Sequence, residues 1–172
     1  MNGTPANDGP ADGGPADDGP VDGGPADDGP VDGGPVDGGP VTGTLHHVEI
    51  WVPDLPRAVA GWQWLLTALG YTEFQNWSEG RSWRLGDTYL VMEQSPALSA
   101  DRHDRCRPGL NHLAFHVQGR ARLDALVEQA PAHGWTLMFA DRHPYAGGEQ
   151  HYAAYLEDRD GFEVELVASG QS

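Results

Sequence analysis

Several features are scarce or absent in this sequence, and each absence excludes a class of protein. Cys106 is the single cysteine, so an internal disulfide and a thiolate-rich metal site are both excluded, and a reducing compartment is expected. No apolar run approaches the length of a membrane span, and the first thirty residues contain no charged segment followed by an apolar one. We therefore predict a cytoplasmic protein without a membrane partner.

Basic residues are few compared with acidic ones. The chain has 10 basic and 26 acidic residues, which gives a formal net charge of −16. Residues 1–43 contain nine aspartates and no basic residue, so the remaining 17 acidic and 10 basic residues leave the rest of the chain at −7. A nucleic-acid partner requires a basic footprint on the domain, and this balance argues against one.

Residues 1–43 also lack aromatic side chains. Proline falls on every fifth position from Pro5 to Pro40, in units such as Gly-Pro-Ala-Asp-Asp. Such a segment cannot bury enough apolar surface to offset its chain entropy, and collagen would need glycine at every third position. We predict a disordered, extended, acidic tail over residues 1–43, followed by one folded domain over residues 44–169.

An internal repeat organises the folded part. The alternating segment 45–52 recurs 65 residues later as segment 110–117, with a histidine at the third position of each copy. Apolar residues at helical spacing follow both segments. The first helix begins after Asp54, a good N-cap, and ends at Gly70, and the second helix ends at Gly134.

A strand-like run begins at Tyr71 in the first copy and at Trp135 in the second, and two closing strands follow in each copy, which makes the repeated unit βαβββ. The closing strands of the two copies are expected at residues 81–85, 88–94, 151–156 and 162–168. We predict an α+β fold of two tandem modules, residues 44–95 and 110–169, with curled mixed sheets that form an open cleft and helices on the outer face.

Strand alternation places ionisable residues on the face away from the helices. These residues are His47 and Glu49 in the first copy, and His112, His116, Glu163 and Glu165 in the second. One interpretation is a sheet face that is merely solvated and polar. The other is a metal site, because two histidines at equivalent repeat positions and a glutamate on the last strand suit iron(II), manganese and related ions. Spacing alone does not show that the three side chains converge.

Three segments together resemble the vicinal oxygen chelate superfamily. They are His47–Leu55, Asn111–Phe115 and Asp160–Leu166, and the resemblance extends over residues 45–168. The superfamily includes glyoxalase I, fosfomycin-resistance thiol transferases, bleomycin-resistance proteins and extradiol dioxygenases. Fold and chemistry separate widely in such superfamilies, so the resemblance indicates the fold more specifically than the reaction.

The resemblance implies a metal site with His47, His112 and Glu165 as ligands for a divalent ion such as Mn, Fe, Ni or Zn. Members that resemble glyoxalase place a further carboxylate where this chain has Val91, and Glu93 follows two residues later on the same face. Glu93 is therefore a displaced fourth ligand, a group that orients a ligand, or a polar residue near a strand end.

Two further residues on the open face are candidates for catalysis. Glu49 and His116 lie two or four residues from the expected ligands, so they are candidates for proton transfer or for orienting a ligand. The alternative is that both are ordinary solvated strand residues.

The segment between the modules concentrates arginine. Arg102, Arg105 and Arg107 are candidates to bind an anionic substrate group, and the alternative is a crossover loop that neutralises an acidic surface. Trp51 and Tyr152 are candidates for aromatic walls of the substrate site, although most tryptophans in such a domain are packing residues.

Two hypotheses of function remain. The first is a metal-dependent enzyme that chelates a small oxygen-rich molecule and acts as a lyase, thiol transferase, isomerase or dioxygenase. The second is a metal-free protein that binds or sequesters a small molecule, as bleomycin-resistance proteins do. Three ligand-type residues favour the enzyme, because a pure binder has no need of them. The resemblance also implies a homodimer.

Overall fold

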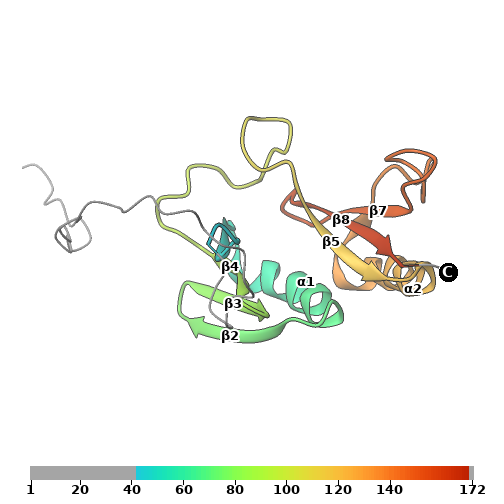
Figure 1. Cartoon of the computed structure of the whole chain (residues 1–172). Coiled ribbons are helices and arrows are strands. Elements are labelled where there is room, and N and C mark those ends of the chain that lie inside the picture. Colours follow the sequence, from blue (N-terminus) through green and yellow to red (C-terminus); the bar gives the residue numbers. More distant parts are fainter. Residues whose placement is uncertain (1–41, 171–172) are drawn as a thin grey trace, which may run out of the picture. The chain divides into compact units, whose positions relative to one another are not determined.

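The computed structural model describes residues 42–170 (Figure 1). The tail predicted for residues 1–43 lies, apart from its last two residues, outside the described residues. Among residues 42–170, no helix combines the length and the apolar character that crossing a membrane would require.

The predicted βαβββ repeat is confirmed. The first module contains β1 (His47–Trp51), α1 (Leu55–Ala68), β2 (Thr72–Trp77), β3 (Gly80–Leu85) and β4 (Thr88–Glu93). The second contains β5 (His112–Gln118), α2 (Arg120–Gln129), the 3-10 helix η1 (Ala130–His133), β6 (Thr136–Leu137), β7 (Ala153–Glu157) and β8 (Glu163–Ser169).

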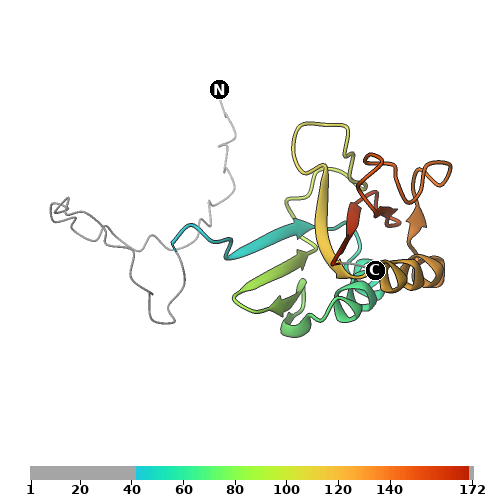
Figure 2. The ribbon, with the colours of Figure 1, turned by 45° about the vertical axis from the view of Figure 1, so that its right-hand side comes forward.

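Each module folds into its own four-stranded mixed sheet. The strand orders are β1-β4-β3-β2 and β5-β8-β7-β6, so the first strand of each module lies beside the last. β1 pairs with β4 and β5 with β8 in parallel, and the other neighbours are antiparallel. Figure 2 shows β5 and β8 side by side. This is the α+β arrangement predicted from the repeat.

α1 begins and ends where the sequence predicts. The Asp54 carboxylate accepts a hydrogen bond from the backbone N–H of Arg57 at 2.9 Å, which is the contact expected of an N-cap. Gly70 follows the helix with φ +94°, a left-handed conformation that costs glycine little. Apolar residues at helical spacing, Trp62 and Leu66 among them, are buried in the core.

The second helix is shorter and more polar. Leu123 and Leu126 are its buried residues, and Pro131 lies in η1, where the α-helical pattern has already ended. Gly134 ends this segment with φ +84°.

Two tryptophans join the modules in one core. The rings of Trp62 and Trp135 meet edge to face with centroids 5.0 Å apart. Trp62 Nε1 donates to the buried carboxylate of Asp158 at 2.9 Å, and Trp135 Nε1 donates to the Gly61 carbonyl at 3.2 Å. Burial raises the pKa of Asp158, although hydrogen bonds from Trp62 and from the backbone N–H groups of Phe162 and Asp160 act against the rise.

Replacing Trp62 with Phe is expected to lower the free energy of unfolding by about 1–3 kcal/mol, before any loss of packing, because Asp158 Oδ2 loses its indole donor. Urea denaturation followed by circular dichroism at one fixed protein concentration measures the change. Trp51→Phe is the control, since Trp51 is 42% exposed and its replacement is expected to change the value by less than about 0.5 kcal/mol. Equal effects of the two changes would contradict this account of the core.

Candidate functional site

The parallel pairing of β5 and β8 brings two of the predicted metal ligands together. His112 Nε2 lies 3.2 Å from Glu165 Oε2 on the face of the second sheet that α2 does not cover. Glu165 is in the central strand β8, with Ala114 of β5 and Tyr155 of β7 as its neighbours across the sheet. The carboxylate is almost fully buried, whereas His112 is partly exposed.

A second imidazole contacts the same carboxylate. His151 Nε2 lies 2.5 Å from Glu165 Oε1, so the two oxygens of Glu165 face two different histidines. Tyr155 also forms a side-chain hydrogen bond with Glu165. The site in the second module is therefore His112, His151 and Tyr155 arranged around Glu165.

These contacts keep Glu165 ionised despite its burial. Burial alone would raise the pKa of Glu165, but the hydrogen bonds from His151 and Tyr155 and the nearby imidazoles lower it below its usual value. In Tyr155, burial and hydrogen bonding both shift the pKa upwards. Burial, and then the hydrogen bond to the Glu165 carboxylate, raise the pKa of Tyr155 to about 12. Tyr155 thus remains a hydrogen-bond donor in neutral solution.

Sequence reasoning missed His151 and Tyr155 as site residues. Tyr155 could have been found from alternation in the last two strands, because it faces Glu165 across the sheet. His151 lies before β7, in a turn where its backbone N–H donates to Gly148, and periodicity does not place such a residue. Gly147 packs so closely that an added Cβ would lie 2.6 Å from His151 Cδ2 and 2.7 Å from Tyr155 Oη.

The third predicted ligand lies on the other sheet. The His47 ring stacks on Tyr89 with centroids 5.0 Å apart, and His47 Nδ1 is 2.9 Å from His46 Nδ1. Within residues 42–170 no group of three His, Cys, Asp or Glu side chains is placed to hold a metal ion. The structure of one chain therefore does not group His47 with His112 and Glu165, whose strands belong to the other sheet.

The remaining candidates from the open faces are also dispersed. The Glu49 carboxylate accepts a hydrogen bond from Trp51 Nε1 at 2.7 Å, and Glu93 is half-buried at the end of β4. His116 Nδ1 lies 2.6 Å from the Ser169 hydroxyl, two residues beyond Ala114 on β5. Tyr152 is on the helix side of the second sheet, where its hydroxyl donates to Asp124 of α2 at 2.8 Å. This position does not bring Tyr152 to the open face.

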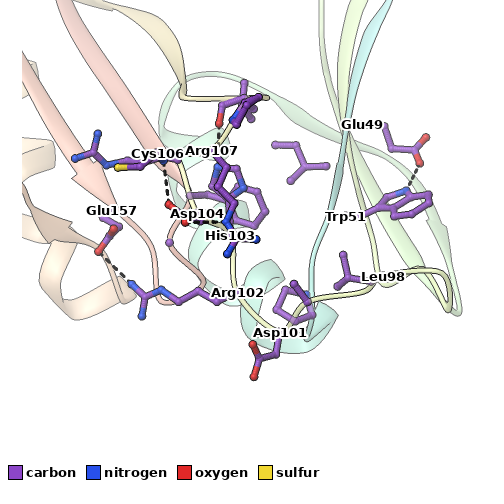
Figure 3. A pocket seen from close by; sticks show the side chains of 18 residues that line it. Glu49, Trp51, Leu98, Asp101, Arg102, His103, Asp104, Cys106, Arg107 and Glu157 are labelled. Carbon is purple, nitrogen blue, oxygen red and sulfur yellow. Dashed lines mark hydrogen bonds and ion pairs between the residues drawn. The ribbon is translucent and has the colours of Figure 1, made fainter.

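A cavity of about 820 Å³ lies between β1 and the segment that joins the modules (Figure 3). Five of the residues predicted for catalysis or substrate binding line this cavity: Glu49, Trp51, Arg102, Arg105 and Arg107. None of the metal-ligand candidates lines it. This cavity is therefore not the single cleft that was expected between the two open faces. It is lined by the joining segment and not by β5 or the open face of β8.

The three arginines of this segment already have carboxylate partners. Arg102 lies 3.6 Å from Glu157, and Arg107 pairs with Asp104 at 3.1 Å within the segment itself. Arg105 Nε is 3.0 Å from Glu163 Oε2, a buried atom, without hydrogen-bond alignment. The pairs of Arg102 and Arg105 favour the alternative interpretation, a crossover segment that neutralises acidic groups of the second module.

Comparison with known proteins gives consistent matches. The sequence model of the Glyoxalase/Bleomycin resistance protein/Dioxygenase superfamily matches residues 46–155. The uncharacterized protein YqjT of Bacillus subtilis (strain 168) is 47% identical over 126 residues, which are 72% of this chain and 98% of YqjT.

Solved structures resemble the same part of the chain. A protein of Bacillus halodurans, provisionally named a glyoxalase, is 45% identical with a TM-score of 0.71, over 74% of this chain and 97% of that one. A variant of the fosfomycin resistance protein FosX of Listeria monocytogenes, complexed with Mn(II) and 1S,2S-dihydroxypropylphosphonic acid, is 22% identical with a TM-score of 0.54, over 76% and 93%. The second likeness concerns the fold alone.

Tyr155→Phe is expected to remove the most alkaline component of the tyrosine titration, because burial and Glu165 raise the pKa of Tyr155 to about 12. The ultraviolet absorbance of tyrosinate, followed across the alkaline range in the folded protein, measures this component. Tyr145→Phe, at an exposed ring, is the control and is expected to leave the component in place. Its persistence in Tyr155→Phe would mean that Tyr155 does not contact the carboxylate.

Proposed function

The chain belongs to the Glyoxalase/Bleomycin resistance protein/Dioxygenase superfamily, and from this premise we propose that it is a metal-dependent enzyme acting on a small oxygen-rich molecule. The observation that carries the proposal is the approach of His112 Nε2 to Glu165 Oε2 at 3.2 Å. An imidazole and an ionised carboxylate on one open face are two of the ligands that Mn, Fe, Ni and Zn accept. The FosX structure with Mn(II) supports a divalent metal in this fold.

The third ligand in this proposal is His47 of the partner subunit in a homodimer. Two observations support it. The described part of one chain supplies no third side chain for the ion, and His47 is exposed on the uncovered face of the first sheet. Closed symmetric dimers are the commonest assemblies of soluble chains, and twofold symmetry would build two equivalent sites at once.

The residues of this chain have distinct parts in the proposed site. His112 and Glu165 would hold the ion, and a divalent ion there would polarise an oxygen of the substrate. His151 and Tyr155 donate to Glu165, which fixes the carboxylate and leaves Oε2 directed at His112. Glu49 and His116 remain the candidates for proton transfer, each on an open face.

A metal-free binding protein is the second candidate function. The cavity of about 820 Å³ beside β1 favours it, because that volume suits a small organic molecule and the metal-ligand candidates do not line it. In this case Trp51 and the neighbouring apolar residues would bind the ligand, and His112 would not be needed.

Metal analysis separates the two candidates. The purified protein is expected to bind about one equivalent of Mn, Fe, Ni or Zn per chain, and His112→Ala to lose it, because an imidazole ligand is removed. His133→Ala is the control, because His133 of η1 stacks on Trp64 of α1 and does not contact Glu165. Less than about a tenth of an equivalent in the wild type, with no thermal shift on adding metal, would discard the enzyme in favour of the binding protein.

Mixed dimers test where the third ligand comes from. His47→Ala and His112→Ala chains should each lose metal as homodimers, whereas a dimer with one chain of each kind should regain about one of its two sites. The regained site would combine the intact His47 of one chain with the intact His112 of the other. Metal content of the doubly tagged, co-purified mixed dimer is the measurement. No recovery of metal would overturn the shared site.

A further inference from the structure

The open face of the first sheet carries an arginine beside the row that contains His47. Arg84 of β3 lies opposite Tyr89 of β4, and Tyr89 lies opposite His47 of β1. Neighbours across a sheet point to the same side, so the three side chains share one face. Trp83 and Leu90, the next residues in these strands, are buried in the core, which places Arg84 and Tyr89 on the uncovered side.

Aromatic rings connect Arg84 to His47. The Arg84 guanidinium carbon lies 3.9 Å from the Phe74 ring centroid and 6.0 Å from that of Tyr89. The Phe74 and Tyr89 centroids are 5.4 Å apart, and Tyr89 stacks on His47. The result is a continuous surface, here called the aromatic platform (Phe74 and Tyr89), with a cation at one end and an imidazole at the other.

A local irregularity of the sheet creates this platform. The register between β2 and β3 shifts between Glu73 and Gln75, so Phe74 has no partner in β3. Such a β-bulge re-aims a side chain, and bulges are frequent beside functional sites. Phe74 remains 41% exposed, so its ring contributes little to the core, and its contacts are with Arg84 and Tyr89.

Arg84 differs from the arginines of the joining segment in having no acidic partner. Arg102, Arg105 and Arg107 each pair with a carboxylate, whereas no carboxylate of residues 42–170 lies within ion-pair distance of Arg84. Its Nε atom is buried and has no hydrogen-bond partner in that part of the chain. An unpaired guanidinium held against a ring can receive a carboxylate or a phosphonate through two parallel hydrogen bonds.

We propose that Arg84 and the aromatic platform select the substrate, and that the substrate is a small organic anion with a flat apolar part. Its carboxylate or phosphonate would bind Arg84, its flat part would lie on Tyr89 and Phe74, and its oxygen-bearing end would reach His47. This inference rests on the proposed function for the role of His47. It assigns substrate selection to β3 rather than to the arginines of the joining segment.

Calorimetric titration with benzoate, phenylphosphonate and benzamide tests the assignment, with the protein prepared both loaded with Mn(II) and metal-free. Benzoate and phenylphosphonate are expected to bind the wild-type protein, and the uncharged benzamide to bind at least about tenfold more weakly. Arg84→Gln should weaken binding of both anions by about tenfold or more without changing metal content or thermal stability. Arg84→Lys should lie between the two, because lysine keeps the charge and loses the stacked, forked geometry.

Arg81→Gln is the matched control. Arg81 is on the same strand, three residues away, and pairs with Glu73, so its loss is expected to leave anion binding within about twofold of the wild type. Anion binding by Arg84→Gln at the wild-type level, or a wild type that binds benzamide as well as benzoate, would overturn the inference.

The metal measurements keep the two proposals separate. Loss of metal in His112→Ala together with unchanged anion binding in Arg84→Gln would refute the role of Arg84 alone. Anion binding that depends on Arg84 in a protein that takes up no metal would refute the metal-dependent function alone.

Discussion

Parallel pairing of the first and last strands of each module decides which side chains can meet. In the second module, β8 lies between β5 and β7, so Glu165 has His112 on one side of its strand and Tyr155 on the other. In the first module the same pairing brings His47 next to Tyr89 and, one strand further, Arg84. One topological feature thus positions the candidate side chains of both open faces.

Burial of a carboxylate in the centre of a sheet destabilises the fold unless other groups bind the carboxylate. In the second module, three side chains contact the Glu165 carboxylate. His151 and Tyr155 come from the end of a loop and from β7, and His112 comes from β5. Because these groups donate hydrogen bonds to the carboxylate, its pKa stays below the usual value despite burial, and Oε2 remains directed at the His112 imidazole.

The sequence predicted the elements well, because local chemistry decides them. Asp54 at the start of α1, Gly70 and Gly134 after the helices, and alternation in the strands are signals that act over a few residues. The proximity of His112 to Glu165 also followed, because alternation and the repeat put both on one face of neighbouring strands. Tyr152, a candidate for an aromatic wall of the substrate site, lies instead on the helix side of the second sheet, where its hydroxyl donates to Asp124.

By itself, the sequence determined the superfamily, the two βαβββ modules and the ionisable character of their open faces, since each depends on residue order over short distances. The tertiary structure alone decided which charges are neutralised and which remain available. It paired Arg102 with Glu157 and Arg105 with Glu163. It placed Arg84 against the ring of Phe74, at the β-bulge of β2, and it put His47 and Glu165 in separate sheets. Charge pairing and the relation between two sheets depend on distances between residues far apart in the chain, and residue order does not specify those distances.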